Sequence, residues 1–222
     1  MINKIIPAVR TENITYAVRD IVVLANQVAK TGKEMLYLNI GDPNLYDFVP
    51  PKHLVDATYQ AMLKNLNGYA PSSGIGEAVK AIETEAERKG ITNVHDIFVT
   101  TGASEAIDIC LTALVNDGEN VLTPTPGYPL YTAIASKLQM MENPYYLDES
   151  NGWLPDIEDI KSKINDKTKA IVLINPNNPT GSLYTRENLQ QIVDLALEHN
   201  LVIFADEIYD KLLFDGKKHI SI

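Results

Sequence analysis

The sequence predicts an α/β fold built around a mostly parallel sheet. Two apolar runs, KAIVLI at 169–174 and LVIFAD at 201–206, are nearly continuous rather than alternating, which is typical of strands covered on both faces. Segments with apolar residues at helical spacing lie between such runs. Alternation of strands and helices favours parallel strands joined by right-handed helical crossovers.

The first part of the chain predicts a separate opening unit. Apolar residues at helical spacing predict a helix over 15–31, which ends at Gly32. A short apolar strand is expected over 35–40, before the turn at 41–43, and a polar, proline-rich passage follows. We therefore predict a boundary that separates residues 1–44 from residues 45–222.

The remaining elements follow the alternation of apolar runs and helical spacing in chain order. The pattern predicts helices over 52–66, 75–89, 103–115, 127–138, 156–164 and 185–199. Strands are expected over 96–101, 119–123, 140–147, 169–174 and 201–206.

The composition limits the class of protein. The sequence has nineteen Lys and Arg and twenty-nine Asp and Glu, so the net charge is 19 − 29 = −10. A negative net charge disfavours binding to nucleic acid and to anionic membranes. The only cysteine, Cys110, lies at an apolar position of its helix and is expected in the core. No secretory signal or membrane-spanning run is visible. We expect a soluble cytoplasmic protein.

Ligands of parallel sheets bind beyond the carboxyl ends of the strands, so these ends are the candidate sites. After the strand expected over 96–101, Gly102, Ala103 and Ser104 open a helix, and a helix N-terminus attracts anions such as phosphate. The alternative is that Ser104 and Glu105 only cap the helix.

Two later strand ends carry polar side chains. Asn175 to Gly181 (NPNNPTG) follows one strand, and its amides are able to grip a carboxylate or a phenolic oxygen; a turn before a helix capped by Thr185 is the alternative. Asp206 follows the next strand, with Tyr209 three residues on. A carboxylate there needs a cation, unless it only caps a helix.

Three further residues are candidates for ligand contacts. Gly41 permits close approach of a ligand or serves only its turn, Tyr69 lies on a loop, and Tyr128 is either core or a flat surface for a ring. Gly74-Ile75-Gly76 lacks the third glycine and the preceding strand of a dinucleotide-binding fingerprint. The four histidines show no metal-ligand spacing, so no metal site is expected.

Together these motifs resemble the class I/II, fold type I aminotransferases, which use pyridoxal 5'-phosphate. The resemblance rests on NIGDP (39–43), GYAPSSG (68–74), TTGASEAI (100–107), PTPGYPLY (124–131), NPNNPTG (175–181) and ADEIYDKLLFDG (205–216). Within that family the chain is most similar to the alanine (glutamate–pyruvate) aminotransferases. The resemblance implies a three-layer sandwich, with an N-terminal arm and small-domain segment at 1–44 and the first part of the large cofactor-binding domain at 45–222.

The resemblance also implies a role for each candidate residue. Asp206 would pair with the pyridine nitrogen of the cofactor, and Tyr209 and Asn178 would bind its phenolic oxygen. Tyr128 would stack on the ring, and the phosphate would lie against Gly102, Ala103 and Ser104. Asn178 and Gly41 would contact the substrate, an amino acid or a 2-oxo acid. Tyr69 would reach the phosphate of a neighbouring subunit, which implies a homodimer.

The sequence departs from the family pattern in one respect. The family's cofactor-binding lysine follows the aspartate motif by a few tens of residues, whereas only 222 − 206 = 16 residues follow Asp206 here. Lys211, Lys217 and Lys218 do not match that lysine motif. We therefore expect residues 1–222 alone to be inactive, as part of a longer enzyme. A lyase or synthase on the same fold and a non-catalytic scaffold for dimerisation remain alternatives.

The family geometry implies two cis peptide bonds. Thr125-Pro126 and Asn178-Pro179 are expected to be cis, so that Tyr128 and Asn178 face the cofactor.

Overall fold

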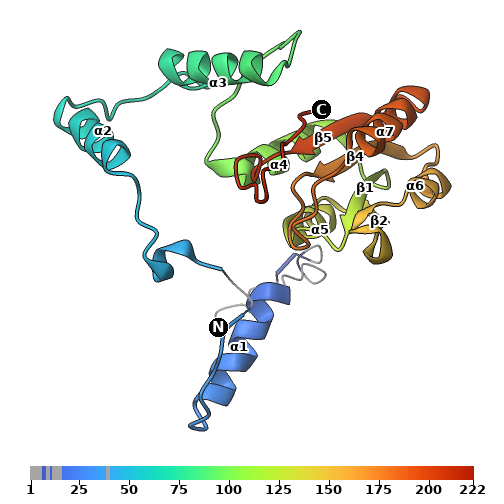
Figure 1. Cartoon of the computed structure of the whole chain (residues 1–222), viewed down its shortest axis with the longest axis horizontal. Helices are drawn as coiled ribbons and strands as arrows, with labels where there is room; N and C mark the ends of the chain where they lie inside the picture. Colours follow the sequence, from blue (N-terminus) through green and yellow to red (C-terminus); the bar gives the residue numbers. More distant parts are fainter. Residues whose placement is uncertain (1–6, 9–10, 12–16, 39–40) are drawn as a thin grey trace, which may run out of the picture. The chain divides into compact units, whose positions relative to one another are not determined.

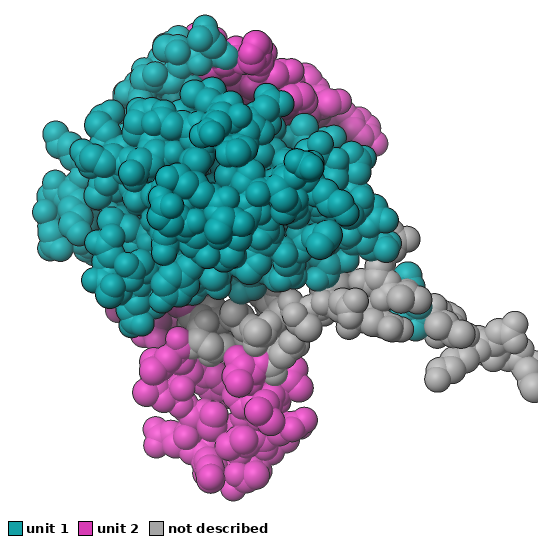
Figure 2. Space-filling view, turned by 90° about the vertical axis from the view of Figure 1, so that its right-hand side faces the viewer, with its two compact units in different colours: residues 1–16, 86–93, 100–222 teal, residues 17–85, 94–99 magenta. Residues whose placement is uncertain are grey.

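The computed structural model describes residues 7–8, 11, 17–38 and 41–222. The chain divides into two compact units: residues 1–16, 86–93 and 100–222 form the first, and residues 17–85 and 94–99 form the second (Figure 2). This division does not test the predicted boundary between residues 44 and 45, which stays a prediction.

The first unit contains a five-stranded sheet in the order β3-β2-β1-β4-β5. Figure 1 labels all of these strands except β3. Its strands are β1 (Asn120–Thr125), β2 (Met141–Asp148), β3 (Leu154–Pro155), β4 (Thr168–Ile174) and β5 (Val202–Asp206). β2, β1, β4 and β5 pair in parallel, and only β3 is antiparallel to its neighbour. The predicted mostly parallel sheet is confirmed, and the carboxyl ends of four strands meet at one edge.

Four helices cover the two faces of this sheet: α4 (Gly102–Leu114), α5 (Pro129–Leu138), α6 (Ile157–Lys163) and α7 (Arg186–Glu198). One buried cluster joins α4 and α5 to Val172, and another joins α6 and α7 to Ile171 and Leu173. Successive residues of a strand point to opposite faces, so β4 contributes to both clusters. These layers confirm the predicted three-layer α/β arrangement.

The short strand β3 is not foreseen by the sequence pattern. A 3-10 turn, η3 (Glu149–Asn151), leads into it, and Gly152 adopts a left-handed conformation with φ of 67°. Leu154 and Pro155 then pair antiparallel with Asp148 and Leu147. Two residues are too few to show a hydrophobic period, so no pattern predicts this strand.

The second unit consists mainly of helices: α1 (Ala17–Ala29), η2 (Pro43–Tyr46), α2 (Lys52–Leu63) and most of α3 (Gly76–Lys89), whose last turn belongs to the first unit. The three predicted α-helices are confirmed in their described parts. Neither α2 nor α3 has a buried residue. No helix in the described part of the chain is long and apolar enough to cross a membrane.

Two predicted strands are wrong. Residues 35–38 of the expected strand over 35–40 are not in a strand, and residues 39–40 lie outside the described residues. Residues 96–101 are also irregular: Val99 N donates to Ser73 O at 2.9 Å, but no ladder forms. A strand needs a paired neighbour, and within the described ranges no such neighbour accompanies either segment.

The expected burial of Cys110 is also wrong, because this residue is exposed. It lies beside Phe204 and Ala205, along a cavity of about 220 Å³ between α4 and β5. β5 is the edge of the sheet among the described residues, and its residues are half-buried or exposed. The side of α4 that lies along β5, which includes Cys110, is therefore apolar, and no other described element covers it.

Candidate functional site

A cavity of about 240 Å³ lies in the first unit, at the carboxyl ends of β4 and β5 and beside the N-terminus of α4. Its lining consists of Ala103, Ser104, Ile107, Tyr128, Ile174, Asn178, Asp206, Ile208 and Tyr209. Ile107, Ile174 and Ile208 form its apolar part, and the other residues are among those singled out by the sequence. Segments far apart in the chain thus bring the predicted side chains to one place.

The N-terminus of α4 forms one wall of the cavity. Gly102 begins the helix with φ of 75°, a left-handed conformation that favours glycine. Glu105 accepts a hydrogen bond from the backbone N–H of Thr101, so Glu105 caps the N-terminus of α4, as the alternative interpretation expects. Ala103 and Ser104 line the cavity instead. Since the first N–H groups of a helix lack partners within it and carry partial positive charge, this wall suits an anion.

Tyr128 forms a second wall at the start of α5. The Thr125-Pro126 bond is cis, as predicted. A Cβ atom at Gly127 would collide with the carbonyl oxygen of Pro124, so only glycine fits this close turn. Tyr128 then precedes Pro129, the first residue of the helix, and lines the cavity. Tyr128 packs against the core cluster and also lines the cavity, and its stacking on a ring stays a prediction.

The loop after β4 positions Asn178. Asn178-Pro179 is cis as predicted, and Asn175-Pro176 is cis as well. Asn177 is 3% exposed, donates from Nδ2 to Thr180 Oγ1 at 2.9 Å, and leaves its Oδ1 atom without a hydrogen bond. The alternative interpretation of this segment, a turn before a helix capped by Thr185, is also confirmed: Thr185 Oγ1 accepts a hydrogen bond from Asn188 N and caps α7. The loop therefore serves both the cavity and the next helix.

Asp206 ends β5, is half-buried and lines the cavity. The hydroxyl of Tyr131 donates to its Oδ2 at 2.9 Å, and Ile208 N donates to its Oδ1 at 3.3 Å. Burial, together with the negative charge of Asp206, raises the pKa of Tyr131 far above its usual value of 10.0. Tyr131 thus remains a protonated donor and orients the carboxylate.

Tyr131 is the functional candidate that sequence reasoning missed. It is 3% exposed and belongs to the core cluster beside α4, so its position in the sequence is that of a core residue, although its hydroxyl binds Asp206. A signal was present, because Tyr131 follows Tyr128 by one helical turn in PGYPLY. Residues at that spacing share a helix face.

Gly41 and Tyr69 lie in the second unit, so the structure does not test their predicted contacts with this cavity. A Cβ atom at Gly41 would meet no atom within 4 Å. Tyr69 is fully exposed. Their roles toward substrate and toward a neighbouring subunit stay predictions.

Comparisons with known proteins point to one family. The model of the aminotransferase class I and II family matches residues 33–222. The glutamate-pyruvate aminotransferase AlaA of Haemophilus influenzae is 45% identical over 220 residues, which are 96% of this chain and 53% of that protein. The alanine aminotransferase of Mycobacterium tuberculosis is 45% identical over 201 residues, which are 89% of this chain and 47% of that protein. The chain spans about half the length of the curated relatives it matches.

Solved structures agree with this. An alanine aminotransferase from Pyrococcus furiosus superposes with a TM-score of 0.92 at 39% identity, covering 97% of this chain and 55% of that one. An aminotransferase from Escherichia coli gives a TM-score of 0.92 at 40% identity, covering 99% of this chain and 55% of that one. The chain is therefore a member of the aminotransferase class I and II family.

Proposed function

We propose that the full-length protein is a pyridoxal 5'-phosphate-dependent aminotransferase that moves an amino group between alanine or glutamate and pyruvate or 2-oxoglutarate. The observation that carries this proposal is the convergence of Ser104, Tyr128, Asn178, Asp206 and Tyr209 on one cavity. The names of the relatives support the choice of alanine and glutamate.

The residues around the cavity fit this cofactor. A helix N-terminus suits a phosphate, and Tyr128 offers an aromatic face for a ring. Asp206 accepts one hydrogen bond at each carboxylate oxygen, from Tyr131 and Ile208, and keeps acceptor capacity for a further donor. When bound, pyridoxal phosphate supplies an electron sink for negative charge at the substrate's α-carbon.

In this proposal each wall of the cavity has one task. Asp206 holds the proton on the pyridine nitrogen, because a carboxylate stabilises a cation beside it. Tyr209 and Asn178 hydrogen-bond the phenolic oxygen, and Asn178 also orients the substrate carboxylate. Gly102, Ala103 and Ser104 hold the phosphate, and Tyr128 covers the ring face and excludes water from it. Gly41 contacts substrate through its backbone.

The quaternary and cellular parts of the proposal follow the family. We propose a homodimer in which Tyr69 of one subunit reaches the phosphate bound by its partner. The full exposure of Tyr69 leaves it accessible for such a contact. The lysine that binds the cofactor covalently lies outside residues 1–222 in this proposal, and the enzyme works in the cytoplasm.

The test uses the full-length protein supplied with pyridoxal phosphate, L-alanine and 2-oxoglutarate. We expect a visible absorbance band from bound cofactor, and pyruvate and glutamate in equal amounts. Release of ammonia with pyruvate from a sulfur amino acid would identify a lyase instead. Absence of both cofactor binding and turnover would leave the scaffold alternative and overturn the proposal.

A further inference from the structure

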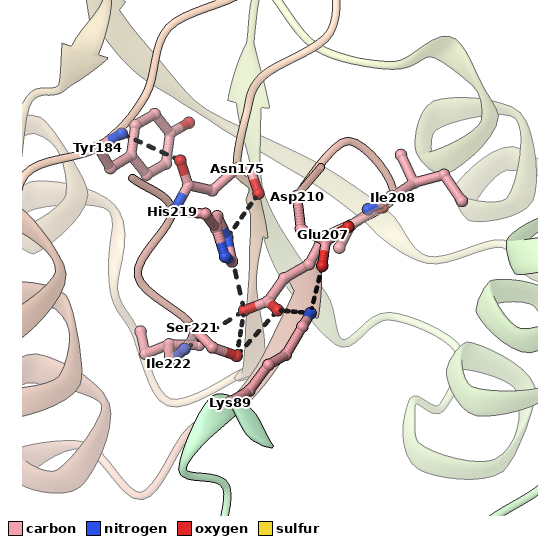
Figure 3. A network of polar contacts seen from close by, with 10 residues as sticks. Lys89, Asn175, Tyr184, Glu207, Ile208, Asp210, His219, Ser221 and Ile222 are labelled. Carbon is pink, nitrogen blue, oxygen red and sulfur yellow. Dashed lines mark hydrogen bonds and ion pairs between the residues drawn. The ribbon is translucent and has the colours of Figure 1, made fainter. Parts of the chain in front are cut away.

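The turn that follows β5 carries two sets of polar side chains with different surroundings. Asp206 and Tyr209 line the cavity described above. Glu207 and Asp210, each next to one of them in the chain, take part in a network of polar contacts with Lys89, His219 and Ser221 (Figure 3). We call these five residues, Lys89, Glu207, Asp210, His219 and Ser221, the clamp.

Lys89 joins the two acidic members of the clamp. Its ammonium group lies 3.0 Å from Glu207 Oε2 and 2.7 Å from Asp210 Oδ2. The side chains of Lys89, Glu207 and Asp210 are only 20%, 15% and 17% exposed. Burial lowers the pKa of Lys89, but hydrogen bonds and the charges of Asp210 and Glu207 outweigh it and raise that pKa above 10.5. Lys89 therefore stays charged and holds Glu207 and Asp210 together.

Glu207 has further partners from the segment at 219–222. The hydroxyl of Ser221 donates to both carboxylate oxygens at 2.8 Å, and Ile222 N donates to Oε1 at 3.3 Å. A buried carboxylate needs such donors, because desolvation without them is costly. These contacts hold Glu207 in one orientation.

His219 connects the clamp to the neighbouring strand end. The side chain of His219 is 8% exposed, and its Nε2 atom lies 3.1 Å from the carbonyl oxygen of Asn175 and 3.9 Å from Glu207 Oε1. A carbonyl oxygen only accepts, so Nε2 carries a hydrogen and donates it. Asn175 begins the loop that carries Asn178, so the clamp touches both strand ends that border the cavity.

We propose that Glu207 is a positioning residue for the reaction: with Lys89, Ser221 and His219 it fixes the turn Asp206–Asp210, and thereby the orientation of Asp206 and Tyr209 toward the cofactor. This inference rests on the proposed function, because it assigns a role within the same site. Lys89 fixes Glu207 and Asp210, and the intervening backbone carries Tyr209. A small displacement of a reacting group is costly even when its cause is remote.

The experiment compares Glu207→Gln with Glu158→Gln in the full-length protein loaded with pyridoxal phosphate. Glu158 also pairs with a lysine, Lys161 at 2.7 Å, but it is exposed on α6 and does not line the cavity, so it is the matched control. Three quantities are measured: the single-turnover rate constant with L-alanine, the alanine concentration for half-saturation, and the visible circular dichroism of the bound cofactor.

We expect Glu207→Gln to lower the rate constant about tenfold and to change the dichroism band, with the half-saturating alanine concentration within about twofold. Glu158→Gln is expected to leave all three unchanged. If Glu207→Gln lowers only the melting temperature, and rate constant and dichroism match the parent, its role is merely structural and the proposal is overturned.

A second variant covers the case in which Glu207→Gln fails to fold. Ser221→Ala removes one donor to Glu207 and keeps the charge pair with Lys89. It is expected to change the dichroism in the same direction and to lower the rate constant about threefold, and parental values in this variant would overturn the proposal. Failure of the parent itself to bind pyridoxal phosphate would instead refute the proposed function.

Discussion

The two strand ends that border the cavity are built in different ways. The loop after β4 is held largely by its own atoms: Asn177 N donates to Ser182 O at 2.9 Å, Gly181 N to Asn177 O at 2.8 Å, and Tyr184 N to Asn175 Oδ1 at 3.0 Å. The turn after β5 has short internal contacts too, such as Asp210 N to Glu207 O at 3.0 Å. Its side chains, however, are held by residues distant in the chain, including Tyr131.

This difference predicts two kinds of failure. A change in the β4 loop removes partners of buried groups within the loop and should lower stability first. A change in the β5 turn alters the orientation or charge of groups that face the cavity and should lower the reaction rate first. The variants below, all in the full-length protein, test this distinction from the largest expected effect to the smallest.

Asp206→Ala is expected to have the largest effect. It leaves the proposed pyridine nitrogen without its anion, and breaking a buried ion pair costs about 3–5 kcal/mol. Because each ~1.4 kcal/mol is about tenfold in rate, the half-reaction with L-alanine should slow roughly a hundredfold or more. A spectrophotometric single-turnover assay measures this, with the exposed Asp166→Ala as control. A rate near that of the parent would show that Asp206 is not the partner of the pyridine nitrogen.

Asn175→Ala tests the β4 loop. The buried backbone N–H of Tyr184 loses its acceptor, which should cost about 1–3 kcal/mol in the free energy of unfolding. Urea denaturation measures the loss, and the exposed Gln190→Ala should change stability by less than about 0.5 kcal/mol. A variant as stable as the parent but slow in turnover would reverse the proposed distinction between the two strand ends.

Tyr209→Phe should have a smaller effect than Asp206→Ala. It removes one hydrogen bond to the phenolic oxygen of the cofactor, worth about 0.5–1.5 kcal/mol or up to about 3 if the acceptor is charged. Turnover should therefore fall about tenfold or less, and about a hundredfold at the limit. Tyr146→Phe, at a half-exposed tyrosine of β2 that does not line the cavity, is the control. A loss equal to that of Asp206→Ala would argue for a different role for Tyr209.

The change in the free energy of unfolding caused by Lys89→Met should not depend on pH in the neutral range. The folded-state pKa of Lys89 is raised above 10.5, so its contribution to stability is fully present below pH 10.5 and is lost as the pH rises through the folded value. The difference in unfolding free energy between parent and variant should thus be the same at pH 7 and pH 9. A difference that has already shrunk at pH 9 would contradict the charge pairing of Lys89 with Glu207 and Asp210.

The sequence predicts the central sheet well because β4 and β5 are long apolar runs with turn residues at their ends. The cavity was predictable for a related reason: parallel strands place their carboxyl ends together, so residues after β4 and β5 meet without any knowledge of side-chain contacts. The family resemblance supplied the ligand, which the pattern of residues alone does not name.

The failures have a physical cause in common. Residues 35–38 and 96–101 are apolar enough for strands, but a strand depends on a partner elsewhere in the chain, and the local pattern does not reveal one. Cys110 sits at an apolar position of α4, but burial of that position depends on what covers β5. The partners of Asp206 and Glu207 escaped prediction because Tyr131, Lys89 and Ser221 are remote in sequence.

The two-residue strand β3 has a consequence for self-association. It pairs only with Leu147 and Asp148 of β2, so the outer side of residues 141–146 is an edge of the sheet among the described residues, as β5 is on the other side. Pro144 has no N–H to offer an incoming strand there, and the backbone N–H of Tyr146 already donates to Asp159 Oδ2 at 2.7 Å. Addition of a further strand is therefore less favourable on this side of the sheet than at β5.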